Sequence, residues 1–170
     1  GTYYLHYRVV DAVGNEKVGY VGPYRYDNAV PTFSANPSSG DWKNTAHVVT
    51  PTFGDSQSGV KTKQYAWTTS TTTPSSWTDY SSGTLTQPGA GTHYLHYRIV
   101  DHAGNEKIGY VGPYRYDNTA PSANLTQSPT SWTNGNVNLI LTDVSDTLSG
   151  VKSITLPNGE TITETSATYT

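Results

Sequence analysis

The chain has 170 residues, of which only 34% are hydrophobic and 14% are charged, and 13 acidic against 10 basic side chains give a net charge of −3. This balance excludes the basic surface typical of proteins that bind nucleic acid or anionic membranes, so neither is expected as a partner. The absence of cysteine excludes disulfides, thiolate metal sites and cysteine nucleophiles.

The sequence contains an internal repeat. Residues 1–31 recur at 91–121 with seven differences, and the segment SGVK occurs at both 58–61 and 149–152. A period of about 90 residues therefore predicts three segments: the C-terminal strands of one domain (1–30), a complete domain (31–120) and the N-terminal part of a third (121–170). No secretory signal opens the chain, and we expect it to be an internal piece of a longer protein.

The complete segment predicts strands throughout. Short stretches rich in β-branched and aromatic residues are separated by clusters of turn-forming residues such as NPSSG, GDSQSG and HAGNEK. The spacing of these turns is typical of an all-β sandwich. The predicted strands are, in chain order, 46–53, 61–68, 77–80, 84–86, 92–100 and 109–116.

The strand at 92–100 alternates between two faces. Leu95, Tyr97 and Ile99 share one face, which we assign to the core, while Tyr94 and His96 share the other. The polar run at 68–76 is predicted to be an exposed connection between two sheets.

Several motifs resemble the bacterial immunoglobulin-like repeats that occur in tandem in surface and secreted proteins. They are the run SGV at 58–60, the run YLHYR at 94–98, the turn from Asp101 to Asn105, and the Asp-Asn pair before a Pro at 117–121. The resemblance implies tandem immunoglobulin-like β-sandwiches and an extracellular location at the cell surface. The second half of segment 121–170 departs from the pattern and is similar to a different subtype.

Histidine pairs are the first candidates for metal binding or catalysis. His93 and His96 are three residues apart, which on a strand places them on opposite faces. We therefore expect ordinary cross-strand packing of His6 and His96, and no enzymatic role.

Calcium is the one ion that the sequence brings into consideration, and no other cofactor is expected. Each period ends in an Asp-Asn pair, whose oxygens would gather with Asp55 or Asp143 of the following loop; the four candidate ligands are Asp27, Asn28, Asp117 and Asn118. Calcium takes about six to eight oxygen ligands, more than the sequence supplies at either place. The alternative is that these residues form turns in a rigid linker.

Aromatic side chains are candidates for ligand binding, because exposed rings stack on sugars and on protein surfaces. Trp77, Tyr94 and Tyr114 are the residues we select, with Trp77 expected to be the most exposed tryptophan. The alternative is that the tyrosines stiffen the sheet by cross-strand packing, and that Trp42, Trp67 and Trp132 are structural.

The sequence thus predicts a stalk or fibre element of an adhesin-like bacterial surface protein, with neighbouring copies of the same domain as partners. Segments 1–30 and 121–170 are complementary parts of one kind of domain, and we interpret the chain as a slice of a longer covalent tandem array. The alternative is head-to-tail assembly by strand complementation into a filament. Other functions left open are a module that binds cell-wall glycan, host glycan or a host protein, and an accessory domain of a secreted polysaccharide hydrolase.

Overall fold

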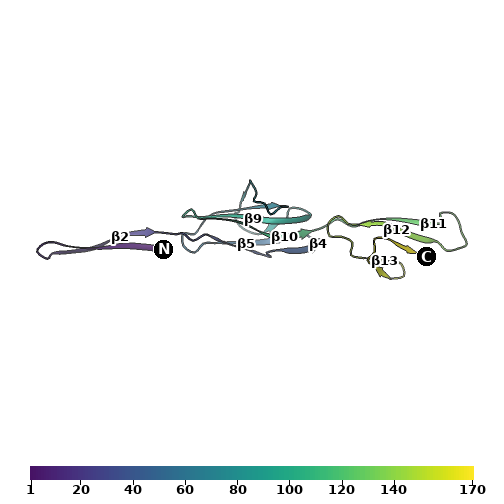
Figure 1. Ribbon diagram of the computed structural model, residues 1–170, viewed down its shortest axis with the longest axis horizontal. Helices are drawn as coiled ribbons and strands as arrows, with labels where there is room; N and C mark the ends of the chain where they lie inside the picture. The colour runs from purple at the N-terminus through teal and green to yellow at the C-terminus, as the bar shows by residue number, and fades with distance from the viewer. The chain divides into compact units, whose positions relative to one another are not determined.

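The chain is all-β. A computed structural model describes all 170 residues and contains strands and turns without any helix (Figure 1). No helix long and apolar enough to cross a membrane is therefore present. The strands are β1 (Thr2–Val10), β2 (Glu16–Arg25), β3 (Thr32–Asn36), β4 (Gly40–Lys43), β5 (Val48–Gly54), β6 (Val60–Thr68), β7 (Thr78–Asp79), β8 (Leu85–Thr86), β9 (Gly91–Asp101), β10 (Glu106–Tyr116), β11 (Ser122–Ser128), β12 (Asn138–Ser145), β13 (Ile154–Thr155), β14 (Thr161–Ile162) and β15 (Ala167–Tyr169).

The six strands predicted between residues 46 and 116 correspond to β5 through β10. Sequence analysis missed β3 and β4, which flank the turn-forming cluster at 36–40. Only residues 37–39 of that cluster lie outside a strand, since β3 ends at Asn36 and β4 begins at Gly40. The turn between β3 and β4 is therefore only residues 37–39, shorter than the five-residue cluster in the sequence suggests.

The residues form two compact units. Unit 1 comprises Gly1–Ser39, Val48–Gln87 and His93–Pro113, and unit 2 comprises Gly40–His47, Pro88–Thr92 and Tyr114–Thr170. Two sheets dominate the middle of the chain: a three-stranded sheet in the order β3-β5-β8 and a five-stranded sheet in the order β4-β10-β9-β6-β7.

The core of unit 1 is the face of β9 that the alternation predicts. Leu95 and Ile99 are 0% exposed, as is Val49 of β5. Phe33 of β3 stacks on Tyr97 of β9 with ring centroids 3.9 Å apart. The predicted all-β character and the assignment of Leu95 and Ile99 to the core are confirmed, and the contact between facing sheets is β-sandwich-like.

The opposite face of β9 is more enclosed than predicted. His96 is only 1% exposed, and its Nε2 lies 2.9 Å from the carbonyl oxygen of Ser70. The polar run at 68–76 thus folds over this face, although its own side chains are mostly exposed. The expectation that this run connects two sheets is wrong, because β6 and β7 pair with each other in one sheet.

The hairpin β1–β2 is the exposed copy of β9–β10. Its strands pair only with each other, from Thr2 opposite Arg25 to Val10 opposite Glu16. Leu5 is 61% exposed and Val9 is 60% exposed, whereas the equivalent Leu95 and Ile99 are fully buried. Nearly identical sequences therefore form the same strands with opposite degrees of burial.

Unit 2 contains two further sheets, β11-β12-β15 and β13-β14, and the pairing of β4 with the end of β10. Val144 of β12 is 7% exposed and Tyr114 of β10 is 0% exposed. The ring of His47 packs against Tyr114 at 5.7 Å, and its Nε2 lies 3.0 Å from the carbonyl oxygen of Arg115.

Candidate functional site at the segment junctions

Three carboxylates meet where segment 1–30 joins the following residues. Asp27 follows β2, Asp55 follows β5, and Asp101 is the last residue of β9. Ligand oxygens of the three lie within 4.8 Å of one another. Sequence analysis placed Asp27 beside Asp55 but treated Asp101 only as a turn residue, because no spacing rule links the end of β9 to residue 27.

Two of these carboxylates close their own loops. Asp55 Oδ1 accepts hydrogen bonds from the amides of Gln57 (3.0 Å) and Gly59 (2.7 Å). Asp101 accepts two from Asn105, one from its amide and one from its side chain, both at 2.8 Å. In each tight turn some amide groups have no backbone carbonyl to bond to. The carboxylate of the acid accepts their hydrogen bonds instead.

Asp27 connects two parts of the chain. Its Oδ1 accepts a hydrogen bond from the amide of Ala29 at 2.9 Å, and its Oδ2 accepts one from the amide of Ser58 at 2.8 Å. The side chain of Asn105 also donates to the carbonyl oxygen of Asp27 at 3.3 Å. The linker after β2 is therefore tied to the loop after β5 and to the β9–β10 turn.

Hydrogen bonds favour the ionised form of both Asp27 and Asp101. The adjacent Ser58 side chain, followed by the amide of Ala29, lowers the pKa of Asp27. Burial by itself would raise the pKa of Asp101, but the hydrogen bonds from Asn105 and from the turn outweigh it, and the pKa is lowered. The cluster therefore carries negative charge at neutral pH.

The same bridge occurs again after β10. Asp117 Oδ1 accepts from the amide of Thr119 at 2.9 Å, and Oδ2 accepts from the amide of Ser149 at 3.0 Å. Asp146 is the counterpart of Asp55 here. Its Oδ1 accepts hydrogen bonds from the amides of Leu148 and Gly150. The neighbouring Ser149 side chain contributes most to lowering the pKa of Asp117, ahead of the amide of Thr119.

The other residues expected at these junctions lie apart from the bridges. Asp143 accepts a hydrogen bond from Asn124 at 2.7 Å, so Asp146 and not Asp143 is the acid that closes the loop near Asp117. Asn28 and Asn118 are exposed beside Asp27 and Asp117.

The geometry of the first cluster fits a divalent cation in part. Oxygens bound to one calcium ion at about 2.4 Å can be at most about 4.8 Å apart, and the three carboxylates satisfy this limit. Asp55 Oδ2 is buried without a hydrogen-bond partner, so one oxygen has no donor within the protein. The remaining carboxylate oxygens already accept from amides, and three acids supply fewer than the six to eight ligands that calcium takes.

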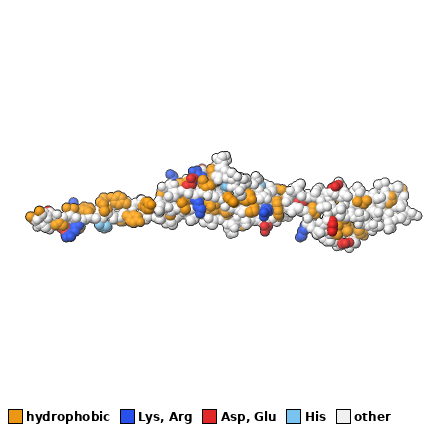
Figure 2. Space-filling model, in the orientation of Figure 1, with side chains coloured by type: hydrophobic (Ala, Val, Ile, Leu, Met, Phe, Trp, Pro, Cys, Tyr) orange, Lys and Arg blue, Asp and Glu red, His pale blue; other side chains and the backbone are white.

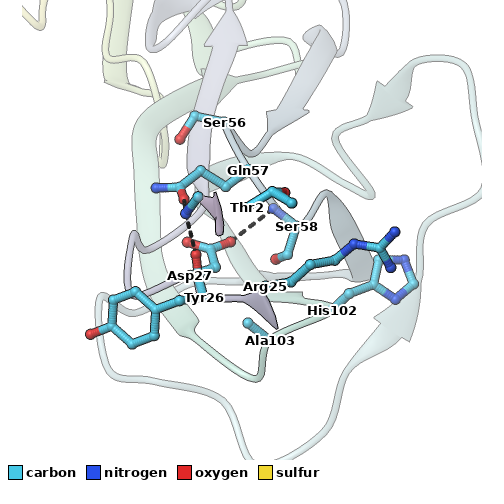
Figure 3. Close-up of a pocket in the computed structure, with 10 residues that line it drawn as sticks. Thr2, Arg25, Tyr26, Asp27, Ser56, Gln57, Ser58, His102 and Ala103 are labelled. Atoms are coloured by element: carbon cyan, nitrogen blue, oxygen red, sulfur yellow. Dashed lines mark hydrogen bonds between the residues drawn. The ribbon is translucent and has the colours of Figure 1, made fainter. Parts of the chain in front are cut away.

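A pocket of about 700 Å³ lies beside Asp27 (Figure 3). Figure 3 shows the Asp27 carboxylate facing the amide of Ser58, while the side chains of Arg25 and His102 extend together away from it. The hydrogen bond between Asp27 and the amide of Ser58 at this pocket ties the linker after β2 to the loop at 55–59.

The aromatic candidates are largely enclosed. Tyr114 is 0% exposed, and burial raises its pKa to about 12, so the expectation that Tyr114 binds a ligand at the surface is wrong. Gly112, with φ at 123°, interrupts the extended strand, so the alternation that starts at Tyr110 does not continue to Tyr114. Tyr94 is half-buried and packs edge-on against Tyr110 at 5.8 Å.

The tryptophans differ from their expected ranking. Trp77 is half-buried, whereas Trp132 is fully exposed (104%) and Trp42 is 37% exposed. The expectation that Trp77 is the most exposed tryptophan is therefore wrong. The segment around Trp132 lacks the strand that β4 forms around Trp42, which leaves the ring uncovered.

His93 and His96 have different hydrogen-bond partners. His93 Nδ1 lies 3.1 Å from the side-chain nitrogen of Gln87, and His96 Nε2 lies 2.9 Å from the carbonyl oxygen of Ser70.

Comparison of the chain with family models, with curated proteins and with solved structures finds no match.

Proposed function

We propose that the chain is a structural element of an extracellular bacterial surface protein, in which tandem immunoglobulin-like β-sandwiches form a stalk or fibre. In this proposal residues 31–120 are one complete domain, and residues 1–30 and 121–170 belong to its neighbours. The observation that carries it is the repeated junction. Asp27 and Asp117, 90 positions apart, each bind the amide of a Ser in the next loop, Ser58 and Ser149.

A repeated bridge of this kind restricts bending. Pro31 follows the first bridge and is fully buried, which anchors the linker after Asp27. Proline fixes its own φ and keeps the preceding residue extended. A linker held at one end by a carboxylate bridge and at the other by a buried proline transmits orientation from one domain to the next. The function is then mechanical and non-enzymatic, and reach grows with the number of domains.

Distance measurements between spin labels test this mechanism at the second junction. The chain has no cysteine, so Lys43→Cys and Gln127→Cys introduce the only labelling sites, on exposed strand positions at either side of Asp117. We expect a narrow distance distribution that broadens in the Asp117→Ala variant. Asp143→Ala is the matched control, because that carboxylate binds Asn124 within the sheet.

A distribution that is already broad with Asp117 intact would contradict the stalk mechanism. Equal broadening by Asp117→Ala and Asp143→Ala would also contradict it, since the effect would then come from general loosening of the sheet and not from the bridge.

A second candidate function is a binding module for glycan or a host protein, either in a surface protein or as an accessory domain of a secreted polysaccharide hydrolase. The full exposure of Trp132 favours it, because an exposed indole ring presents a flat apolar surface for stacking. Saturable quenching of tryptophan emission by cell-wall oligosaccharides, lost in Trp132→Ala and kept in Trp77→Ala, would support binding. Unchanged emission with each oligosaccharide would leave the stalk as the function.

A further inference from the structure

Two Asn-Gly pairs occur in the chain, Asn134-Gly135 and Asn158-Gly159. In such a pair the backbone nitrogen of the glycine can attack the side chain of the preceding asparagine, because glycine has no Cβ to hinder the approach. The two pairs have the same chemistry and lie in different local structures. The structure therefore decides which of them reacts.

Asn158-Gly159 forms the turn of the hairpin β13–β14. The amide of Gly159 donates to the carbonyl oxygen of Leu156 at 2.9 Å, and Asn158 Oδ1 accepts from the amide of Glu160 at 3.0 Å. Gly159 has φ at 86°, a conformation that other residues rarely adopt, so the turn itself requires this glycine. The attacking nitrogen and the side chain it would attack are both engaged in hydrogen bonds of the turn.

Asn134-Gly135 lies in the loop between β11 and β12, and both residues are exposed. The amide of Gly135 donates to the exposed hydroxyl of Thr133 at 3.0 Å, and the side chain of Asn134 has no hydrogen-bond partner. No backbone hydrogen bond closes a turn here. The loop does not require a glycine either: φ of Gly135 is not positive, and a Cβ would meet only Thr133 Oγ1, at 3.6 Å.

The equivalent loop of the middle segment shows that this exposure belongs to the loop itself. Asn44 stands 90 positions before Asn134, as Trp42 does before Trp132. Asn44 is exposed as well, although it directly follows β4, which is paired with β10. The residue after Asn44 is Thr45, whose β-branched side chain crowds its own backbone nitrogen. Reaction is therefore expected at Asn134 and not at Asn44.

We propose that Asn134 is a site of spontaneous deamidation. The Gly135 nitrogen gives up its proton to hydroxide and attacks Cγ of Asn134, and the side-chain nitrogen leaves as ammonia, so that a cyclic succinimide forms. Water then opens the ring at either of its two carbonyl carbons, which yields aspartate or isoaspartate. Water is the only co-reactant, and no atom is oxidised or reduced.

The product changes the charge of a neutral stretch of the chain. Residues 118–142 contain no charged side chain, and Figure 2 shows a mostly uncharged surface around the strand that Figure 1 labels β11. Deamidation places a carboxylate two residues after Trp132, whose side chain is fully exposed. The loop therefore gains a negative charge beside the exposed indole ring, and the isoaspartyl form also lengthens the backbone.

Incubation of the full chain at mildly alkaline pH tests the proposal, with peptide mapping by mass spectrometry at successive times. Tryptic cleavage after Lys152 separates the peptide with Asn134 from the peptide with Asn158. Asn134 should be converted first, and an isoaspartyl methyltransferase should label the same peptide. Asn158 should react at least about tenfold more slowly, because its turn must first lose its hydrogen bonds. Asn44 should keep its amide.

Two controls separate the effect of local sequence from that of structure. Gly135→Thr gives the loop the Asn-Thr pair of the middle segment and should abolish conversion of Asn134 without changing the melting temperature. In the chain unfolded by urea the β13–β14 turn is lost, so Asn158 should react there at a rate similar to that of Asn134.

Three results would overturn the proposal. They are equal rates at Asn134 and Asn158 in the folded chain, an intact Asn134 after a time that converts Asn158 in urea, and undiminished conversion of Asn134 in Gly135→Thr.

Discussion

Single carboxylates organise the junctions through backbone amides. Asp27 and Asp117 use one oxygen for the local turn and the other for the next loop, while Asp55 holds that loop in shape. An ionised oxygen accepts a stronger hydrogen bond than a neutral one, so these bridges depend on charge. The pKa values of Asp27, Asp101 and Asp117 are lowered because these hydrogen bonds favour the ionised carboxylate over the protonated one.

Acid is therefore expected to destabilise the protein in a defined pH window. In the folded chain the pKa values of these groups lie below 3.8, the ordinary value for an aspartate, so their contribution to stability is complete above that pH and is lost as pH falls through the lowered pKa values. The melting temperature should fall steeply below about pH 4. The double variant Asp27→Asn, Asp117→Asn should melt lower at neutral pH and lose part of this dependence.

Asp41→Asn is the control for this experiment, because the Asp41 carboxylate is fully exposed and lies 3.8 Å from Arg115. A pH dependence equally reduced by Asp41→Asn would show that general charge, and not the junction bridges, sets acid stability.

The two copies of the hairpin separate local from tertiary effects. In both, an Asp at the end of the first strand accepts two hydrogen bonds from an Asn four residues later. Gly14 and Gly104 both have positive φ, near 92° and 96°, which the turn requires. The turn thus forms identically whether or not the strands are covered, while only β9 and β10 contribute buried side chains to a core.

Truncation of the same leucine in the two copies should have very different effects. Leu95→Ala removes a side chain that is 0% exposed and should cost about 2–5 kcal/mol of unfolding free energy. Leu5→Ala, at a side chain 61% exposed, should change it by about 0.5 kcal/mol or less. Urea unfolding at concentrations where the chain is monomeric measures both. Similar losses would mean that the hairpin is covered within the single chain.

At the scale of the whole molecule, the proposed stalk needs a rigid connection between successive domains. In this proposal the hydrogen bonds of Asp27 and Asp117 supply that connection, and the carboxylates of Asp27, Asp55 and Asp101 gather at the first of the two places. Close carboxylates repel one another unless amides or a cation compensate. Amides compensate most of the oxygens, and Asp55 Oδ2 is the exception.

Calcium binding at this cluster stays a prediction, and thermal melting tests it. A ligand that binds only the folded state raises the melting temperature, so calcium should raise it and a chelator should lower it again. Asp55→Asn should abolish the response, and Asp143→Asn should keep it, because Asp143 lies outside the cluster. An unchanged melting temperature at millimolar calcium would show that the junctions are held by hydrogen bonds alone.

Sequence patterns predicted the fold in detail where local chemistry decides it. Alternation correctly assigned Leu95 and Ile99 to the core, and turn residues placed the ends of β5 through β10 within a few residues. His96 packs against Tyr110 of the neighbouring strand as predicted, but its expected exposure is wrong because the loop at 68–76 covers it. Tyr114, which follows the positive φ of Gly112, is buried instead of exposed. The periodicity of β9 holds no information on a covering loop that lies elsewhere in the sequence.

The amino-acid sequence by itself determined β5 through β10, the Asp-Asn turns and the 90-residue period, because backbone preferences and turn chemistry act within a few residues. Only the tertiary structure decided which copy of a strand is buried and which acids meet. Leu5 and Leu95 lie in almost the same sequence, yet only Leu95 has a facing sheet. Asp101 joins Asp27 across 74 positions because β9 ends beside the linker after β2, a proximity that depends on sheet order and not on local sequence.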